Sequence, residues 1–337
     1  MGTVDKGGTC YDRLCTIRDI GIETVVFDTN PYLYGGARLF SSIRNRTKSG
    51  LNILKLNKDL LNVVARCNGI THIWFDKAIM IWPSTLRKIK TLTDAILVHY
   101  TPDPQIIWHR SRHFVKSIPL YNILFTTKPF ELEQYKALGA KKAHLTYQAY
   151  DKYRFRPAIP SHEDLINYGC DVVFIGHYEK YRADSIKAIV DSGVKVKVWG
   201  QYWPRYAKLH PWARNVVMAS SVICDQYSLA LISASICLGL LSRFIPETTT
   251  TRTFEIPACG AFMLADRTKE HLDLFEEGNE AEFFSSKEEL LQKVHYYLDH
   301  PQERKEIAKA GRQRCINSGY SFHERLKNIL EIIRDIS

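Results

Sequence analysis

The sequence of 337 residues has no long apolar segment. Its longest candidate, residues 229–241, contains Ser233 and Ser235. A bilayer-spanning helix needs about 20 consecutive apolar residues, so a transmembrane protein is excluded. The first ten residues do not show the basic segment followed by an apolar run that marks a secretory signal. We therefore expect a cytoplasmic protein.

Several short motifs of known chemistry are also missing. There is no Walker A sequence, no G-x-S-x-G nucleophile elbow, no H-E-x-x-H and no Asp-x-Asp, so chemistries built on those motifs are not indicated. The eight cysteines are scattered singly, without a C-x-x-C pair or a Cys/His cluster, and we expect reduced thiols. The sequence predicts no cofactor and no required metal.

The composition is that of an ordinary globular protein, with 45% hydrophobic and 24% charged residues. The length predicts about two domains. Residues 1–160 contain 24 Lys and Arg against 12 Asp and Glu, whereas residues 161–337 contain 22 against 24. The basic first half suits nucleic acid, an anionic acceptor or an anionic membrane surface. Without an RNA-binding or helix-turn-helix signature, we do not expect a nucleic-acid partner.

Short β-branched and aromatic runs alternate with amphipathic stretches, which predicts an α/β fold of parallel sheets. The expected strands are 23–27, 72–75, 95–99, 122–125, 143–147, 171–175, 195–199, 216–218, 236–239 and 262–264. Three helices, 287–298, 301–317 and 322–336, are expected to close the chain. Prolines and polar residues in 151–167 predict a linker between domains 1–155 and 168–320, with a terminal helix at 321–337 that packs back on the first domain.

The start of the chain leaves little room for a first strand. The turn Gly7-Gly8 comes six residues after Met1. We expect residues 1–3 to be the end of a strand whose body lies upstream, in preference to a sheet that begins with 23–27.

The most informative stretch is SRFIPETTTTRTFEIPACGAFMLAD, residues 242–266. It predicts a loop, a helix with a threonine at its N-cap, a glycine stop and a strand. The first turn offers free backbone N–H groups and a positive dipole to a diphosphate, beside Arg252. Glu255 is spaced to accept both hydroxyls of a ribose. A capping box with an Arg/Glu surface pair is the alternative interpretation.

Two further stretches suggest binding groups at strand ends. In DVVFIGHYEKYR, residues 171–182, a strand ends at Gly176 and a helix begins near Glu179, with Lys180 and Arg182 available to phosphate. An ordinary turn with solvated charges is the alternative. Asp28, after the strand 23–27, either binds acceptor hydroxyls or caps a helix.

The segment HYTPDPQIIWHRSRH, residues 99–113, leaves a strand at a point where parallel sheets bind ligands. A carboxylate or imidazole there can take the proton of an acceptor hydroxyl. Asp103 is our first choice of base for an inverting enzyme, and we expect His99 to orient rather than react. A structural loop with exposed basic residues is the alternative.

The pattern R-x-F-E-x-x-A-C-G-x-F-x-L, residues 252–264, resembles the nucleotide-sugar site of GT-B glycosyltransferases, in particular group-1-like transferases of the spore-maturation CgeB type. The likeness covers most of the chain, from GGTCYDRLCTIRDIG at residues 7–21 onward. It implies two Rossmann-like domains facing across a cleft. The second would hold the nucleotide-sugar donor, with Glu255 on the ribose and the helix N-terminus on the diphosphate.

The resemblance and the residue patterns together assign the candidate residues. The donor-binding set is Gly176, His177, Lys180, Arg182, Thr251, Arg252, Thr253, Glu255 and Gly260. The acceptor-binding set is Gly8, Thr9, Asp28, His109 and Arg112, and the catalytic candidates are Asp103 and His99. The implied enzyme is a metal-independent hexosyltransferase acting on a hydroxyl of a glycan, glycolipid or protein-linked acceptor.

Three alternatives remain open at this point. The chain can be a catalytically silent nucleotide-sugar-binding protein with an assembly or regulatory role. Residues 37–48 and 83–92, which mix basic and apolar side chains, either rest on the inner face of a membrane that carries a lipid-linked acceptor or are solvated. The aromatic residues Tyr202, Trp203, Tyr206 and Trp212 either stack on a base or sugar or pack under a loop.

Overall fold

The structure is a computed structural model that describes residues 1–33, 47–107 and 111–335. The chain divides into two compact units, each described by itself. Unit 1 comprises Met1–Tyr147 with Leu326–Ser337, and unit 2 comprises Gln148–Arg325. The division after Tyr147 lies ahead of the expected linker, and part of that linker is helical, because α8 (His162–Tyr168) begins with a capping box between Ser161 and Asp164.

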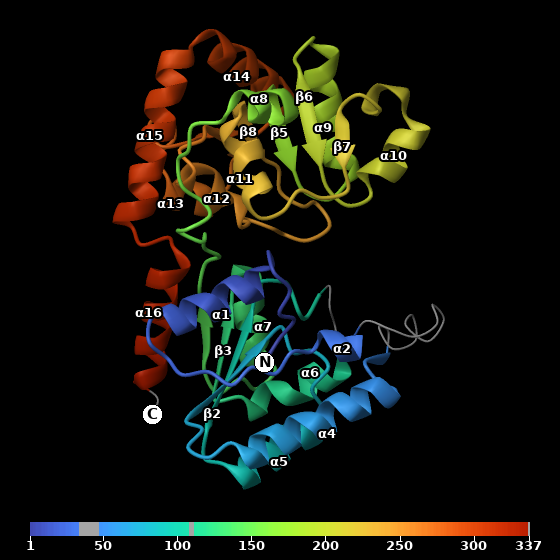
Figure 1. Cartoon of the computed structure of the whole chain (residues 1–337), viewed down its shortest axis with the longest axis vertical. Coiled ribbons are helices and arrows are strands. Elements are labelled where there is room, and N and C mark those ends of the chain that lie inside the picture. Colours follow the sequence, from blue (N-terminus) through green and yellow to red (C-terminus); the bar gives the residue numbers. More distant parts are fainter. Residues whose placement is uncertain (34–46, 108–110, 336–337) are drawn as a thin grey trace. The chain divides into compact units, whose positions relative to one another are not determined.

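Unit 1 contains a four-stranded parallel sheet in the order β1-β2-β3-β4 (Figure 1). The strands are β1 (His72–Asp76), β2 (Ile96–Thr101), β3 (Ile123–Thr126) and β4 (Ala143–Leu145). Its helices are α1 (Thr9–Asp19), α2 (Asn30–Leu33), α4 (Leu51–Arg66), α5 (Pro83–Leu92), α6 (Arg112–Ser117), the 3-10 turn η1 (Ile118–Leu120) and α7 (Pro129–Ala137). These strands confirm four of the five predicted for the first half.

The prediction of a strand at 23–27 is wrong. Within the described residues, this segment pairs only at its end, where Gly2 bridges Asp28. The Gly2 N–H donates to the Phe27 carbonyl at 3.3 Å, and on the other side the Asp76 N–H donates to the Met1 carbonyl at 2.9 Å. Val25 is 64% exposed, so the β-branched residues that suggested a strand have neither a ladder nor a core to join.

The two faces of the unit 1 sheet are covered by different helices. Helices α4 and α5 supply Ile53, Leu56, Leu60, Leu86 and Ile89 to one core. The other face carries Val98, Tyr100, Ile123 and Phe125, which pack against Leu326, Ile329 and Ile333 of α16 (Phe322–Arg334). In Figure 1, α16 is the red helix at the end of the chain, and its packing places it in unit 1 from Leu326 onward.

Unit 2 contains a six-stranded parallel sheet in the order β10-β9-β8-β5-β6-β7. The strands are β5 (Cys170–Ile175), β6 (Val196–Trp199), β7 (Val217–Ala219), β8 (Ala234–Gly239), β9 (Met263–Asp266) and β10 (Glu282–Phe284). Besides α8, its helices are α9 (Lys180–Asp191), α10 (Trp203–Leu209), the 3-10 turn η2 (Pro211–Ala213), α11 (Asp225–Ile232), α12 (Arg252–Ala258), α13 (Lys269–Leu274), α14 (Lys287–Asp299) and α15 (Pro301–Asn317). All five strands predicted for this half are confirmed, and β10 is an addition.

Candidate functional site

The carboxyl ends of β5 and β8 form the candidate site of unit 2, because the ends of adjacent parallel strands lie at one edge of the sheet. The backbone after β5 is fixed. The Gly176 N–H donates to the Trp199 carbonyl at 2.9 Å, and the Gly176 carbonyl accepts from Nε1 of Trp203 at 2.9 Å. A Cβ at Gly176 would lie 2.7 Å from Cζ of Phe174 and 3.2 Å from Nη1 of Arg252. Only glycine therefore lets the Arg252 guanidinium lie against this backbone.

Arg252 is a cation without a carboxylate partner among the described residues. Its Nη2 donates to the Leu240 carbonyl at 3.2 Å, and its guanidinium lies 5.5 Å from the ring centre of Phe174. Its Nε is buried and has no hydrogen-bond partner in the described part of the chain. A guanidinium in this setting has unused donors and an uncompensated charge, which suits an anion.

Arg182 differs from the prediction, because its side chain is only 1% exposed. It lies 3.2 Å from a carboxylate oxygen of Glu179 and 3.7 Å from one of Glu247. Burial, followed by the charge of Arg252, lowers the pKa of Arg182 to about 10. Arg182 is thus committed to two internal carboxylates, whereas Arg252 has no carboxylate partner among the described residues.

The threonines before α12 do not cap it as predicted. The Thr251 backbone is already helical, with φ −58° and ψ −37°, and its side chain makes no capping hydrogen bond. An N-cap side chain reaches the next turn only from a non-helical backbone. Thr253 is instead buried, where its hydroxyl accepts from the Thr250 N–H at 3.1 Å and lies 2.9 Å from Nε2 of His271.

Glu255 faces inward rather than forming a surface pair. It is 7% exposed, and Oε2 accepts a hydrogen bond from the Tyr227 hydroxyl at 2.7 Å. This contact excludes the capping-box interpretation. Gly260 ends α12, with φ +71° and its N–H bonded to the Pro257 carbonyl at 2.8 Å. In the structure, Gly260 therefore terminates the helix.

The loop after β5 also presents His177 and Lys180. Nε2 of His177 lies 2.9 Å from Oε1 of Glu179, and the imidazole is half exposed. Lys180 is largely exposed, and its ammonium donates to Asp184 at 2.6 Å within α9. His177 therefore lies directly beside Gly176, while Lys180 is engaged on the helix surface.

Sequence reasoning missed the roles of three residues that connect the loops at this edge of the sheet: Glu179, Arg243 and Asp266. Glu179 is 2% exposed, and its Oε2 accepts from the Arg243 N–H at 2.9 Å, which joins the loops after β5 and β8. Asp266, at the end of β9, accepts from the Leu241 N–H at 2.7 Å and from Nη2 of Arg243 at 2.7 Å. The position of Asp266 at the carboxyl end of a predicted strand was the available signal.

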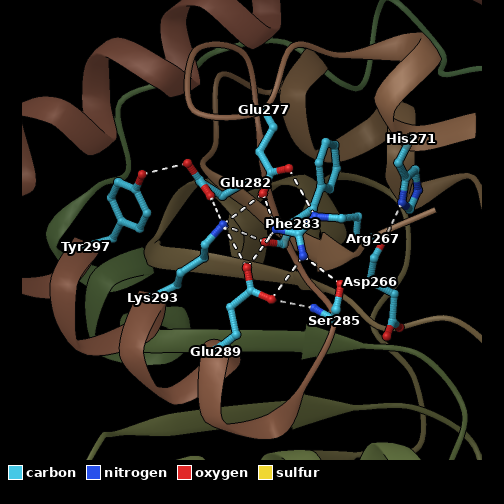
Figure 2. A network of polar contacts seen from close by, with 10 residues as sticks. All are labelled: Asp266, Arg267, His271, Glu277, Glu282, Phe283, Ser285, Glu289, Lys293 and Tyr297. Carbon is cyan, nitrogen blue, oxygen red and sulfur yellow. Dashed lines mark hydrogen bonds and ion pairs between the residues drawn. The ribbon is translucent and has the colours of Figure 1, made fainter. Parts of the chain in front are cut away.

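A second polar network of unit 2 follows β9 (Figure 2). Nε of Arg267 donates to Glu277 at 3.0 Å and Nη2 donates to Glu289 at 2.7 Å. The Lys293 ammonium donates to Glu282 at 2.5 Å and to Glu277 at 2.9 Å. Each of these three carboxylates has a cationic partner, and the contacts hold β10 against α14, so the network has a structural role.

The aromatic residues after β6 support the packing interpretation for three of four members, since Trp212 also packs against the core, with its ring 6.0 Å from that of Tyr206. Trp203 is fully buried, and Tyr206 stacks on Tyr178 and His210 at ring distances of 4.5 and 3.8 Å. Tyr202 is different: it has φ +69° and is 64% exposed. Its ring is therefore available at the carboxyl end of β6.

In unit 1 the expectation for His99 is wrong. The residue is fully buried between the rings of Phe114 and Tyr121, at 4.8 and 5.0 Å, and neither ring nitrogen has a hydrogen-bond partner within the ranges that the structure describes. Burial lowers the pKa of His99 to about 3. The side chain lies in the core two residues before the end of β2, so it neither reacts nor orients a ligand.

Asp103 lies beyond the end of β2 and is 39% exposed, with an ion pair to the Lys77 ammonium. Lys77 follows β1 directly and has φ +50°. Two adjacent strand ends therefore bring an accessible carboxylate and an ammonium together. Asp76, the residue before Lys77, forms a buried ion pair with Arg13 through two hydrogen bonds of 2.7 and 2.8 Å. Sequence reasoning did not single out either residue.

The predicted acceptor-binding residues have local structural partners. Oδ1 of Asp28 accepts from the N–H groups of Val4 and Asn30 at 3.2 and 3.0 Å, so its carboxylate holds the local backbone. Gly8 precedes α1, and Thr9 is its first residue. Arg112 begins α6 and is exposed. His109 and most of the basic stretch 37–48 lie outside the described residues.

Across the described ranges, no helix is long and apolar enough to cross a membrane. In the same ranges, no group of three or more His, Cys, Asp or Glu side chains is arranged to hold a metal ion.

Comparison with known proteins identifies relatives of this architecture. Residues 182–331 match the family described as glycosyl transferase-like, and a search of the curated proteins found no significant match. A glycosyltransferase from Rickettsia africae ESF-5 superposes with a TM-score of 0.68 at 14% identity, over 100% of this chain and 97% of the other.

Anabaena HepE in complex with UDP-glucose superposes with a TM-score of 0.66 at 13% identity, over 99% and 98%. Sucrose-phosphate synthase from Thermosynechococcus elongatus gives 0.62 at 12%, over 85% and 78%. These likenesses, with the two parallel sheets, confirm the predicted fold class, two Rossmann-like units of the GT-B type.

Proposed function

We propose, from the match of residues 182–331 to the glycosyl transferase-like family, that the chain transfers a sugar from a nucleotide-sugar donor to a hydroxyl acceptor. The observation that carries the proposal is Arg252. This cation has no carboxylate partner in the described structure and lies against a backbone that only glycine permits, at the carboxyl edge of the sheet. The structure of HepE with UDP-glucose supports a donor of this class.

The donor would bind with its diphosphate beside Gly176 and Arg252. As the glycosidic bond breaks, negative charge develops on the departing diphosphate, and fixed positive groups stabilise that charge without reorganisation. Arg182 contributes indirectly, because it occupies Glu179 and Glu247 and so keeps these carboxylates from Arg252. Glu255, held by Tyr227, is proposed to accept the ribose hydroxyls through its remaining capacity as an acceptor.

The acceptor is assigned to unit 1, whose sequence carries most of the positive charge. Asp103 is the proposed base of an inverting transfer, because a carboxylate at a strand end can take the proton of an attacking hydroxyl. Its carboxylate forms an ion pair with Lys77.

Finer parts of the proposal rest on the sequence alone. They are a CgeB-type subfamily, a transferred hexosyl unit, no required metal, a cytoplasmic location and a lipid-linked or anionic acceptor at the membrane surface. The motif at 252–264 supports the subfamily, and the lack of Asp-x-Asp supports charge compensation by arginine instead of a metal.

The test is a thermal-shift and calorimetric screen with UDP, GDP, CMP, dTDP and ADP, applied to the wild type, Arg252→Ala and Glu255→Ala. A ligand that binds the native state raises its melting temperature. We expect one nucleotide to stabilise the wild type and both variants to lose at least about tenfold in affinity, the effect of roughly 1.4 kcal/mol. Arg205→Ala, which removes an exposed arginine of α10, is the matched control.

Two outcomes would contradict the proposal. Absence of binding by all five nucleotides would remove the donor site. Equal losses in Arg205→Ala and Arg252→Ala would mean that net charge, not this site, attracts the ligand. Release of nucleoside diphosphate from a bound nucleotide sugar then separates a transferase from a silent binding protein.

A further inference from the structure

His177 and Glu179 form a hydrogen-bonded pair at the edge of the candidate donor site. The Glu179 carboxylate is held at both ends: Oε2 accepts the Arg243 N–H at 2.9 Å, and Oε1 lies 3.2 Å from Nη1 of Arg182. The same Oε1 lies 2.9 Å from Nε2 of His177. A buried, doubly anchored carboxylate therefore fixes a half-exposed imidazole next to Gly176.

This pairing determines which ring nitrogen carries the hydrogen. A carboxylate oxygen accepts hydrogen bonds, so Nε2 of His177 is the donor to Glu179. In a neutral imidazole the other nitrogen, Nδ1, then has only a lone pair. A phosphate oxygen also has only lone pairs, so it cannot form a hydrogen bond to Nδ1 until that nitrogen is protonated.

Burial and the neighbouring arginines favour the neutral form of His177 in the free site. The charged groups that face it are Glu179 from its own loop, Arg182 from α9 and Arg252 from α12; Glu247 and Asp266 act on Arg182, one step further away. Burial, followed by the charge of Arg182, lowers the pKa of His177 below its ordinary value, against the opposing effect of Glu179. Near neutral pH the ring is mostly unprotonated without a ligand.

We propose that His177 takes up a proton when the diphosphate of the donor binds beside Gly176 and Arg252, and that Glu179 positions the imidazole for this contact. The inference rests on the proposed function, since it assigns the protonation state in which that site holds its donor. A diphosphate brings two negative charges to a site with two arginines, and these charges reverse the balance that kept the ring neutral. Protonated Nδ1 then donates a charge-assisted hydrogen bond to a phosphate oxygen.

The consequence is donor affinity that depends on pH. Because one proton is taken up per donor, the affinity falls by at most about tenfold for each pH unit above the pKa of His177. A permanent arginine at this position would bind the same anion with no such dependence. The pair would therefore make donor binding responsive to pH in the range where histidines titrate.

The experiment is calorimetry with UDP-glucose, GDP-mannose, ADP-glucose and dTDP-glucose, whose phosphates do not titrate near neutrality. Each titration is performed at about pH 7.5 in two buffers of different ionisation enthalpy, which gives the number of protons taken up. We expect uptake approaching one proton in the wild type. His177→Gln should bind more weakly without uptake, and His177→Arg should bind within about threefold of the wild type, also without uptake.

His162→Gln, an exposed histidine at the start of α8, is the matched control and should retain the uptake. Binding by the wild type without proton uptake, or the same uptake in His177→Gln, would overturn the inference and leave the proposed function standing. No binding by any of the four nucleotide sugars would overturn both. Glu179→Gln adds a test of positioning: we expect it to reduce proton uptake, and rescue by Glu179→Asp would exclude a purely structural effect.

Discussion

Gly176 is the residue on which the geometry of the donor site depends most directly. Its neighbours leave no space for a side chain, since a Cβ would meet both the Phe174 ring and the Arg252 guanidinium. The guanidinium carbons of Arg182 and Arg252 lie 5.7 and 5.5 Å from the centre of the Phe174 ring. Both guanidinium groups therefore contact the Phe174 ring, and the lack of a side chain at Gly176 leaves space for this contact.

Gly176→Ala should displace Arg252 and the Phe174 ring. We expect a loss of about 1–3 kcal/mol in stability from overpacking and a reduction of at least about tenfold in nucleotide affinity, measured by chemical denaturation and calorimetry. Gly193→Ala is the control: its φ is +87°, but nothing lies within 4 Å of the added Cβ. It should lose stability to backbone strain without losing affinity, and a Gly176→Ala protein with normal affinity would show that Arg252 does not bind the anion.

Residue roles were the least predictable part of the site. Gly176 and Arg252 stand out in the sequence because a strand end and a helix start limit where they can be. The partners of Arg182 do not: Glu247 lies 65 positions away in the sequence and meets it only through the packing of the loop after β8 on α9. His99 likewise matches a ligand-binding pattern, and only the burial of its face of β2 identifies it as a core residue.

At the scale of elements, the strand predictions were correct where a hydrophobic run also has neighbouring strands to pair with. β5 and β8 contain the apolar runs 172–175 and 236–238 at the centre of a sheet, where burial on both faces favours such sequences. β10 was missed because this strand, Glu282–Phe284, is short and begins with a charged residue, whose carboxylate accepts from Lys293 and Tyr297. Residues 23–27 show the reverse case, a hydrophobic run with almost no partner strand.

Helix α16 illustrates an element whose place in the fold follows from its amphipathic face. Leu326, Ile329 and Ile333 recur at helical spacing and are each at most 3% exposed against the sheet of unit 1. This terminal helix therefore completes the core of the unit that the first part of the chain forms.

Ile329→Ala should destabilise unit 1 by about 2–4 kcal/mol, because it removes a buried side chain and leaves a cavity. The measurement is urea denaturation of the full chain, monitored by a signal that reports the unfolding of unit 1. Asn328→Ala, an exposed neighbour on the same helix, should change stability by less than about 0.5 kcal/mol. A similarly small change in Ile329→Ala would show that α16 does not stabilise unit 1 in solution.

At the scale of the whole molecule, each unit contains a histidine with no exposed surface, His99 in unit 1 and His271 in unit 2. His99 lies in the core of unit 1 and has no hydrogen-bond partner among the described residues. His271 lies in unit 2, where Nδ1 is 2.7 Å from the Asp266 carbonyl and Nε2 is 2.9 Å from the Thr253 hydroxyl. Burial lowers the pKa of His99 to about 3 and that of His271 to about 4. In both native units the buried histidine is therefore harder to protonate than the same histidine in the unfolded chain.

This arrangement predicts acid sensitivity in both units. The unfolded chain binds a proton at each histidine near pH 6.5, whereas the native sites bind it only near their lowered pKa values. Stability is thus complete above about pH 6.5 and falls as the pH decreases toward 3 to 4, by up to about 1.4 kcal/mol per pH unit for each histidine.

His99→Phe should remove the contribution of unit 1, because a phenyl ring fits between Phe114 and Tyr121 without a group to protonate. We expect the variant to be about 2 kcal/mol more stable than the wild type near pH 5, and the advantage to shrink as the pH rises to 7. Denaturation of both proteins at several pH values measures this difference, and His162→Gln should follow the wild type. Parallel stability curves for the wild type and His99→Phe would mean that His99 is protonated equally in the native and unfolded states. Its buried, unpartnered nitrogens make the opposite result the expected one.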